Sequence, residues 1–416
     1  MSLPRQRLAA TLVALLAWTW AALAVFGATL PASTWVALSP LPRPSHSAIF
    51  AIGVNPFNNQ VLIAGTGEGG LMRSADGGSS WKQVHRDPTG VLTIAFSPSK
   101  AGLVLAGTRG SGAFVSTDAG LTWAAVKGMD GRSVRVFGFA LTLAAAGTDH
   151  GVYVSADELT WRQSGLSNIS IGALAVAAVH DPVRLVAGSD SASAAGGTPL
   201  YKSIDGGTTW TQTSPAISGK VVSCLAAGPV PPKATVRPLI VGTNAGLFTS
   251  RDNGVTFTPN SGGGLLPSTD YTQIAFVTTH FDRYYTASDG GGSASGGLWR
   301  TRDAGRSFTS LAPPMPSVTA LAVSNDETPI LYVATFRPSD QVPLLWAYRD
   351  TGGTPQGPPA TVTPSSSGTR ITPPAAGTSG LTQLLLSSRT PYIVIGVVAL
   401  LVIVLAAVSH FRGRRG

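Results

Sequence analysis

The chain has 416 residues, of which 44% are hydrophobic and 12% are charged, and it contains a single cysteine. This length and apolar content allow a large buried core, while one Cys excludes an internal disulfide framework. The formal net charge of +9 suggests a nucleic-acid or membrane partner, and the positions of the charges decide between them.

Residues 1–28 have the pattern of a signal peptide or an N-terminal signal anchor. Arg5 and Arg7 precede an uncharged apolar run over residues 8–26, and a small residue follows at Ala28. Cleavage near Ala28 would suit a signal peptide, whereas the length of the apolar run suits an uncleaved anchor. Both alternatives predict that the domain that follows is translocated across a membrane.

A short motif, Ser/Thr-x-Asp-x-Gly-x-Ser/Thr-aromatic, recurs six times with some variation, at residues 74–81, 116–123, 155–161, 203–210, 250–257 and 301–308. Its Asp can accept hydrogen bonds from backbone N–H groups of a tight turn, and its Gly can adopt the positive φ that such turns require. The aromatic residue begins the returning strand. We therefore predict that the motif joins two antiparallel strands.

Two further patterns run in step with the motif. An apolar segment rich in Val, Ile, Ala and Phe begins each repeat, and a second apolar segment follows that ends in small residues such as Ala64-Gly65-Thr66. The motif Asp residues are 39 to 51 positions apart, which is the length of a four-stranded propeller blade. Seven repeats of the apolar segments predict an all-β, seven-bladed β-propeller over residues 33–352.

The motif resembles the Asp-box, or BNR, repeat of sialidases, sortilin-type receptors and photosystem II assembly factors. This resemblance implies a structural role for the motif carboxylates, which are Asp76, Asp118, Asp157, Asp205, Asp252 and Asp303. The motif lacks the alternating Asp/Asn ligands and the late Glu of a calcium loop. We predict no metal and no cofactor.

The ends of the predicted propeller complement each other. Residues 35–38 look like the last strand of a blade that has no preceding strands, and the seventh repeat, 318–350, has only three strands. We expect the N-terminal strand to complete the seventh blade and close the ring, because closure leaves no long unpaired edge.

The C-terminal residues predict a membrane tether. Residues 353–390 are rich in Pro, Ser, Thr and Gly and indicate an extended stalk. Residues 391–411 form an apolar run long enough for one transmembrane helix, and the tail 412–416 contains three Arg residues. Together with Arg5 and Arg7, these charges predict a cytoplasmic tail and an extracytoplasmic propeller at the cell membrane.

The high net charge comes mainly from these flanking segments. Seven of the 29 Lys and Arg residues lie outside the predicted propeller, which leaves 22 basic against 20 acidic residues within it. A nearly balanced domain without a basic stripe gives no reason to expect nucleic-acid binding. Cys224 lies in an apolar strand and is predicted to be buried rather than nucleophilic.

Binding residues are expected on the face opposite the Asp boxes, in the turns between the second and third strands. The candidates there are Glu68, Arg109, Asp149, His150, Asp190, Asp289, Arg337 and Asp340. Loops on a rigid scaffold commonly carry binding groups, although turns on any soluble surface are polar.

Two functional classes remain open. A non-catalytic binding or assembly protein, resembling photosystem II assembly factors, would bind a membrane protein or an extracellular protein or glycan. A cell-surface glycoside hydrolase is the alternative, either sialidase-like or inverting with a pair such as Asp149 with Asp190 or Asp289 with Asp340. The chain has only three Glu residues and lacks the Arg-Ile-Pro motif of sialidases, so we predict no catalytic residue and favour binding.

Overall fold

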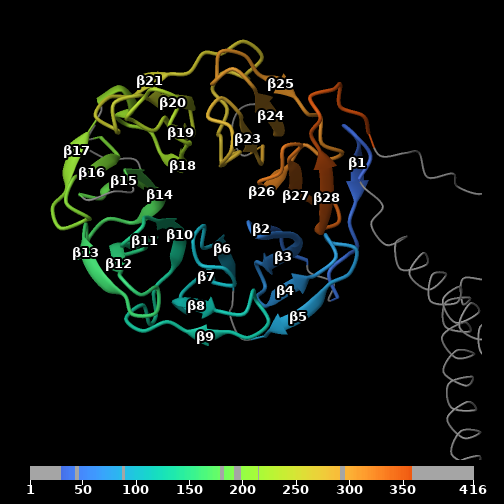
Figure 1. Ribbon diagram of the computed structural model, residues 1–416, viewed down its shortest axis with the longest axis horizontal. Helices are drawn as coiled ribbons and strands as arrows, with labels where there is room; N and C mark the ends of the chain where they lie inside the picture. Colours follow the sequence, from blue (N-terminus) through green and yellow to red (C-terminus); the bar gives the residue numbers. More distant parts are fainter. Residues whose placement is uncertain are drawn as a thin grey trace, which may run out of the picture. The chain divides into compact units, whose positions relative to one another are not determined.

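The computed structural model describes residues 30–42, 46–86, 90–178, 182–191, 198–213, 215–290 and 296–357. Within these ranges the chain forms seven four-stranded antiparallel sheets, arranged as the blades of a ring (Figure 1). In each of the first six blades the strands follow one another from the ring axis outward. The predicted all-β, seven-bladed propeller is confirmed.

The strand bounds are as follows. Blade 1 contains β2 (Ile49–Asn55), β3 (Asn58–Thr66), β4 (Leu71–Ser74) and β5 (Lys82–His85), and blade 2 contains β6 (Val91–Phe96), β7 (Val104–Thr108), β8 (Ala113–Ser116) and β9 (Ala124–Ala125). Blade 3 contains β10 (Val134–Phe139), β11 (Ala144–Thr148), β12 (Gly151–Ser155) and β13 (Arg162–Gly165), and blade 4 contains β14 (Ile171–Ala178), β15 (Arg184–Ser189), β16 (Leu200–Ser203) and β17 (Thr211–Thr213).

A one-turn 3-10 helix, η1 (Pro215–Ile217), leads into blade 5, which contains β18 (Val222–Ala227), β19 (Leu239–Thr243), β20 (Gly246–Ser250) and β21 (Thr258–Pro259). Blade 6 contains β22 (Gln273–Phe276), β23 (Tyr284–Ser288), β24 (Gly297–Thr301) and β25 (Thr309–Ser310). Blade 7 contains β26 (Val318–Val323), β27 (Ile330–Arg337) and β28 (Val342–Arg349), with β1 (Trp35–Ala37) as its outer strand.

Apolar packing between neighbouring blades forms the core. Seven hydrophobic clusters occur among the described residues, one at each blade interface. Second strands such as β7 and β19 are buried along their whole length because blades cover both of their faces. This explains why these strands are continuously apolar rather than alternating.

The small residues that end the second strands allow the blades to approach closely. A Cβ atom on Gly65 would lie 2.3 Å from Val91 Cγ1, and one on Gly188 would lie 2.4 Å from Val222 Cγ1. Val91 and Val222 begin the innermost strands of the next blades. A larger residue at either glycine would therefore push two blades apart.

The N-terminal strand closes the ring, as the sequence predicts. β1 pairs antiparallel with β28, with Trp35 opposite Tyr348. The Trp35 side chain is fully buried, and its Nε1–H donates to the Leu311 carbonyl oxygen of the preceding blade at 2.8 Å. The first and last strands of the ring thus share one sheet, visible where β1 and β28 lie together in Figure 1.

Each of the six Asp boxes forms a turn between the third and fourth strands. In the second box the Ser116 hydroxyl donates to Asp118 at 2.7 Å and accepts the Gly120 N–H at 2.8 Å, while Asp118 accepts the Thr122 N–H and hydroxyl at 2.9 and 2.6 Å. Gly120 has a φ of 85°. The carboxylate therefore closes the turn, as predicted, but it reaches N–H groups up to four residues on.

A seventh, altered box ends β28. Tyr348 pairs with Leu331, just as Ser74, the box Ser of blade 1, pairs with Leu62. Tyr348 therefore occupies the position of the box Ser, and Asp350, two residues later, occupies the position of the box Asp. Asp350 is buried and accepts hydrogen bonds from Arg300 at 2.5 Å and Tyr285 at 2.6 Å. This segment departs from the motif at two positions, because Tyr348 replaces the Ser or Thr and Pro355 replaces the aromatic residue.

Several predicted segments lie outside the described residues. These are the signal segment 1–28, the stalk beyond residue 357, the span 391–411 and the tail 412–416. Among the residues that the structure covers, no helix is long and apolar enough to cross a membrane.

Candidate functional site

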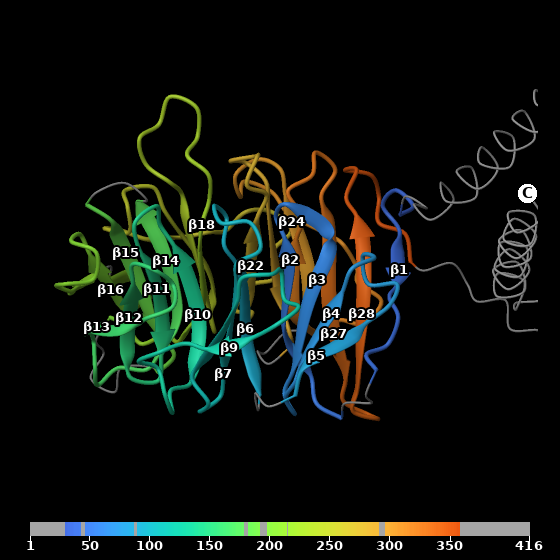
Figure 2. The same cartoon turned by 60° about the horizontal axis from the view of Figure 1, so that its bottom comes forward.

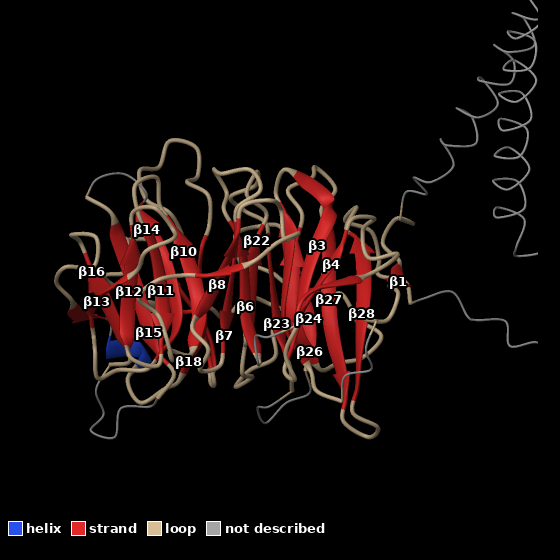
Figure 3. Cartoon of the chain, turned by 90° about the horizontal axis from the view of Figure 1, so that it is seen from below, coloured by secondary structure: helices blue, strands red, loops and turns tan. Residues whose placement is uncertain are grey.

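The two faces of the ring carry different turns. The Asp boxes lie on one face, together with the turns between the first and second strands. We call the opposite face the crossover face, because it carries the turns between the second and third strands and the crossings between blades. Its hairpin between β27 and β28 projects at the bottom of Figure 3.

Four of the predicted binding residues occupy equivalent places on the crossover face. Arg109, Asp149, Asp190 and Asp289 are each the first residue after a second strand. The backbone N–H groups of Arg109, Asp149 and Asp190 donate to carbonyl oxygens of Gly90, Ser133 and Ser170, respectively. These bonds tie each turn to the segment that leads from the preceding blade into the same blade. The four residues therefore occupy equivalent positions around the ring.

Asp149 and His150 belong to one turn with a structural contact. The Asp149 carboxylate accepts the Ser133 N–H at 3.0 Å, and Asn244 makes the equivalent bond to the Val221 N–H at 3.1 Å. His150 Nδ1 lies 3.3 Å from the second Asp149 oxygen. Asp149 therefore serves first to fix the start of an innermost strand.

The other candidates on this face make separate contacts. Arg337 and Asp340 form a two-point ion pair within the exposed β27–β28 hairpin, at 2.7 and 2.6 Å. The hydrogen bond from Arg337 lowers the pKa of Asp340. Glu68 accepts the His46 N–H at 2.9 Å. These residues are not brought together with the Asp149 turn by any described contact.

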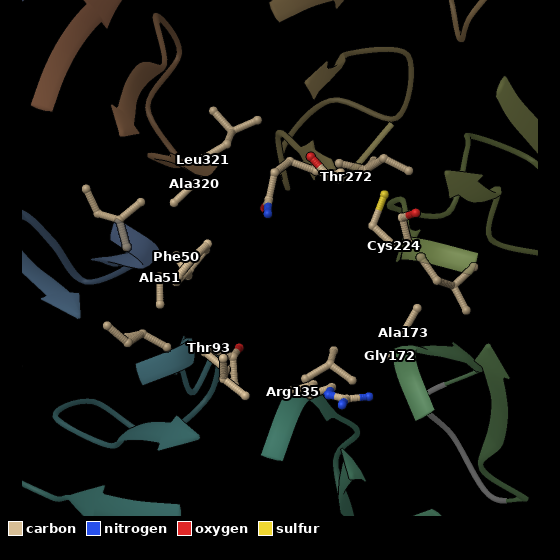
Figure 4. Close-up of a pocket in the computed structure, with 18 residues that line it drawn as sticks. Phe50, Ala51, Thr93, Arg135, Gly172, Ala173, Cys224, Thr272, Ala320 and Leu321 are labelled. Carbon is tan, nitrogen blue, oxygen red and sulfur yellow. The ribbon is translucent and has the colours of Figure 1, made fainter. Parts of the chain in front are cut away.

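The centre of the crossover face contains a cavity of about 210 Å³ at the mouth of the central channel. All seven blades contribute to its wall through their innermost strands. Figure 4 shows these side chains arranged around the opening. A site built from all seven blades is held by the whole ring rather than by one loop.

β-Bulges determine which side chains reach this opening. In six innermost strands the pairing register shifts between the first and third residues, so the residue between them is unpaired. A bulge re-aims a side chain locally. Together with Thr272, which precedes β22, five of the bulge residues line the cavity and form the mouth ring: Phe50, Leu92, Arg135, Gly172, Ser223 and Thr272. The sixth bulge residue, Thr319, instead donates to the Ile49 carbonyl oxygen.

An ion pair crosses from blade 3 to blade 4 in this ring. Arg135 NH1 donates to the Asp190 carboxylate and to the Ser170 hydroxyl, and both charged side chains are about one-third exposed. Gly172 creates the space for this pair, since a Cβ there would lie 2.8 Å from Asp190 Cβ. In Figure 4 the Arg135 side chain extends toward Gly172.

The mouth is chemically asymmetric. Phe50, which is 39% exposed, and Leu92 give it an apolar side. Arg135 with Asp190, and Ser223, which donates to Asp270 at 2.7 Å, give it a polar side. An exposed aromatic ring beside a partly exposed ion pair can contact both the apolar and the polar groups of a peptide segment.

The lining thiol is poorly suited to nucleophilic chemistry. Cys224 Sγ lies 3.1 Å from the Tyr271 carbonyl oxygen, and burial raises the pKa of the thiol. A nucleophilic cysteine requires a lowered pKa. Within the described part of the chain, no three His, Cys, Asp or Glu side chains gather in a way that could hold a metal ion.

Sequence reasoning missed the mouth ring, including Arg135 and Phe50. One signal was available, because Arg135 is a charged residue within a segment otherwise predicted to be a buried innermost strand. Asp190 was identified as a candidate, but its partner was not. The partner lies 55 positions earlier in the chain, so only the blade-to-blade packing brings the two together.

The Asp-box face has a less polar surface. Most exposed large apolar side chains among the described residues lie in its turns, namely Phe57, Leu121, Leu141, Leu159, Ile204, Val230, Val255 and Phe281. The long turn between β18 and β19 extends from this face at the top of Figure 2. The two faces therefore offer different chemistry, and the charged, converging groups are at the channel mouth.

Comparison with known proteins places the fold. No family model matches the chain, and no curated protein matches it. Among solved structures, YCF48 from Cyanidioschyzon merolae is 15% identical with a TM-score of 0.52, over 76% of this chain and 98% of that chain. A structure described as YCF48 bound to D1 peptide is 16% identical with a TM-score of 0.53, over 76% of this chain and 94% of that one.

A glycoside hydrolase is similar to the same degree. The GH74 xyloglucanase from Xanthomonas campestris is 15% identical with a TM-score of 0.54, over 75% of this chain but only 55% of the enzyme. At these identities the likeness concerns the fold alone. The chain is therefore a seven-bladed β-propeller similar in fold to YCF48 and to part of a GH74 enzyme, as its Asp-box repeats predicted.

Proposed function

We propose that this protein is a membrane-tethered, extracytoplasmic β-propeller that binds a peptide segment of a protein partner at the channel mouth, without catalysis. The observation that carries the proposal is the mouth ring, in which Phe50 and the Arg135–Asp190 pair border one opening. An aromatic side chain provides apolar contact area, and a partly solvated ion pair can exchange partners with a bound chain.

The similar fold of YCF48, which has been solved with D1 peptide, supports a peptide as the class of ligand. We transfer only that class, because the identity is too low to carry over the partner itself. The resemblance to photosystem II assembly factors points the same way. A membrane-protein segment is the partner that fits a propeller tethered to the same bilayer.

The tether rests on the sequence and on where the described chain ends. Residues 32–34 bridge to Arg349 and Gln356 beside β1, so both ends of the propeller leave from blade 7. Apolar segments with flanking Arg residues lie beyond both ends, with the Arg on the side expected to be cytoplasmic. This arrangement supports a propeller held at a membrane by one or both segments.

The contacts of the candidate carboxylates favour binding over hydrolysis. An inverting hydrolase needs one carboxylic acid and one free carboxylate across a substrate and a water. Asp149 is bound to the Ser133 N–H, Asp190 to Arg135, and Asp340 to Arg337. The lowered pKa of Asp340 is the opposite of what a general acid requires.

A peptide selection tests this proposal. A displayed random peptide library is selected on the full-length protein in detergent micelles, and the affinities of the selected peptides are measured by fluorescence anisotropy. Phe50→Ala and Arg135→Met should each weaken binding about tenfold or more, whereas Arg162→Met on the exposed outer strand β13 should not.

The same protein is assayed on xyloglucan and on a panel of fluorogenic glycosides. Turnover that is lost on Asp149→Asn or Asp289→Asn would replace the binding proposal with the hydrolase alternative. Selected peptides that bind Phe50→Ala, Arg135→Met and the wild type equally would locate the binding surface elsewhere.

A further inference from the structure

Arg237 provides a cationic group at the other end of the channel. It lies in the turn between β18 and β19, on the Asp-box face. Its Nε–H donates to the Gly228 carbonyl at 2.7 Å, NH1 to Val176 at 3.1 Å and NH2 to Ala227 at 3.4 Å. These bonds fix the guanidinium between the innermost strands of blades 4 and 5.

Among the residues that the structure describes, no carboxylate lies in an ion pair with this guanidinium. None of the ion pairs among the described residues includes Arg237. All three acceptors are neutral carbonyl groups, and they leave two of the five guanidinium N–H groups without a described partner. Burial lowers the pKa of Arg237, in keeping with a cation that has lost water without gaining an anion.

The guanidinium borders a cavity of about 210 Å³. Three innermost strands, β10, β14 and β18, form its walls, with Phe137, Phe139, Leu174 and Val176 among the lining side chains. Arg237 is the only charged residue of this lining. The cavity therefore combines one positive charge with lining side chains that are otherwise apolar, set between the polar backbone groups of the three strands.

We propose that this cavity binds a carboxylate group attached to a short apolar chain, with Arg237 as its anchor. A carboxylate is planar and carries one negative charge, so it matches the charge and the remaining N–H donors of one guanidinium. A phosphate dianion would place a second negative charge against apolar walls without a second cation. The source of the group is a free carboxylic acid or the C-terminus of a peptide.

Calorimetric titration of the full-length protein in detergent micelles, at constant ionic strength with chloride, tests the proposal. Butyrate is the free acid, and its neutral amide, butyramide, is the charge control. A short apolar peptide with a free C-terminus is compared with its amidated form, which separates the two sources. Saturable binding of butyrate but not butyramide is expected, and binding of the free but not the amidated peptide would identify the C-terminus as a second source.

Arg237→Met should weaken the binding of butyrate about tenfold or more, because one or two charge-assisted hydrogen bonds are lost. Lys233→Met removes an exposed charge from the same turn and should leave binding unchanged. Arg237→Lys keeps the positive charge but loses the planar pair of N–H donors, so it should bind butyrate with intermediate affinity. This variant keeps the proposal testable if Arg237→Met does not fold.

Equal butyrate binding by the wild type and the folded Arg237 variants would overturn the proposal. Equal binding of butyrate and butyramide, or an absence of saturable binding to the wild type, would also overturn it. This site lies at the opposite end of the channel from the mouth ring, so its failure leaves the peptide-binding proposal unaffected.

Discussion

Arg135 and Asp190 form an ion pair that joins blade 3 to blade 4 at the channel mouth. The pair exists because Gly172 leaves room for Asp190 and because a bulge turns Arg135 toward the opening. Both side chains are about one-third exposed, where an ion pair contributes little to stability. The pair is therefore better suited to recognition than to holding the blades together.

The first prediction is that this ion pair affects peptide affinity more than the free energy of unfolding. Arg135→Met should change the free energy of unfolding by less than about 1 kcal/mol, because a partly exposed ion pair is worth no more than that. The same variant should lose affinity for peptides selected on the wild type. Urea unfolding and anisotropy titrations measure the two effects, and a large loss of stability with unchanged affinity would make Arg135 a structural residue.

The second prediction concerns the Asp boxes. Asp118→Ala removes the acceptor of four hydrogen bonds and should lower the free energy of unfolding by about 1–2 kcal/mol. Peptide affinity of the folded protein should stay unchanged, because the box lies on the opposite face from the mouth. Thr117→Ala, at an exposed position in the same turn, serves as the control. A loss of affinity without a loss of stability would assign the box a ligand-binding role.

The boxes also predict acid sensitivity. Burial acts to raise the pKa of Asp118, but the hydrogen bonds from Thr122, Ser116 and Leu121 outweigh it and lower the pKa to about 2. Hydrogen bonds from Thr209 lower the pKa of Asp205 to about 2. A lowered pKa in the folded state gives stability that is present above the unfolded-state pKa of about 4 and is lost as pH falls toward 2.

The melting temperature should therefore decrease between about pH 4 and pH 2, where these carboxylates become protonated. Asp118→Asn should flatten this part of the profile, because it removes one of the titrating groups. A profile of the same shape in the variant and the wild type would show that the box carboxylates do not control acid stability.

The fourth prediction concerns the altered seventh box. Asp350→Asn leaves the Arg300 guanidinium, which is 6% exposed, without its carboxylate partner. Removing one member of a buried ion pair costs about 3–5 kcal/mol. The double variant Asp350→Asn with Arg300→Met should recover part of this loss, because the unpaired charge is also gone. Denaturant unfolding of both variants measures the coupling, and additive losses would contradict it.

Ring closure through Trp35 gives the fifth prediction. Trp35→Ala removes a fully buried indole whose ring centroid lies 4.8 Å from that of Tyr348 and whose N–H donates to the Leu311 carbonyl oxygen. The expected loss is about 3–5 kcal/mol, whereas Val36→Ala on the same strand, where the side chain is half-buried, should cost much less. Equal melting temperatures for the wild type and Trp35→Ala would mean that β1 does not stabilise the ring.

The fold was predictable because every blade repeats the same local chemistry. Asp118 with its turn Gly, the small residue at Gly65 and the unpaired strand at Trp35 each indicated one part of the architecture. The seventh box escaped because Tyr348 fills the position of the usual Ser and packs on Trp35. Asp350 still accepts the Gly352 N–H of its own turn, but it also pairs with Arg300.

The channel mouth was much less predictable. Five bulge residues contribute to its wall, and a bulge depends on the packing of neighbouring blades rather than on a local motif. Sequence reasoning placed Asp149 and Asp190 on the crossover face, where the structure has them. It could not show that Asp149 fixes the Ser133 backbone while Asp190 reaches Arg135.

Blocking the channel mouth tests the central claim most directly. Thr93 lies in the wall of the mouth. Because the natural Cys224 lines the same cavity, Thr93→Cys and the control Arg162→Cys are made in a Cys224→Ala background, where each provides a single handle for a bulky maleimide. Attachment at Thr93→Cys should reduce affinity for the selected peptides about tenfold or more, and attachment at Arg162→Cys on the outer strand should have no effect. Unchanged affinity after complete labelling at Thr93→Cys would contradict peptide binding at the mouth.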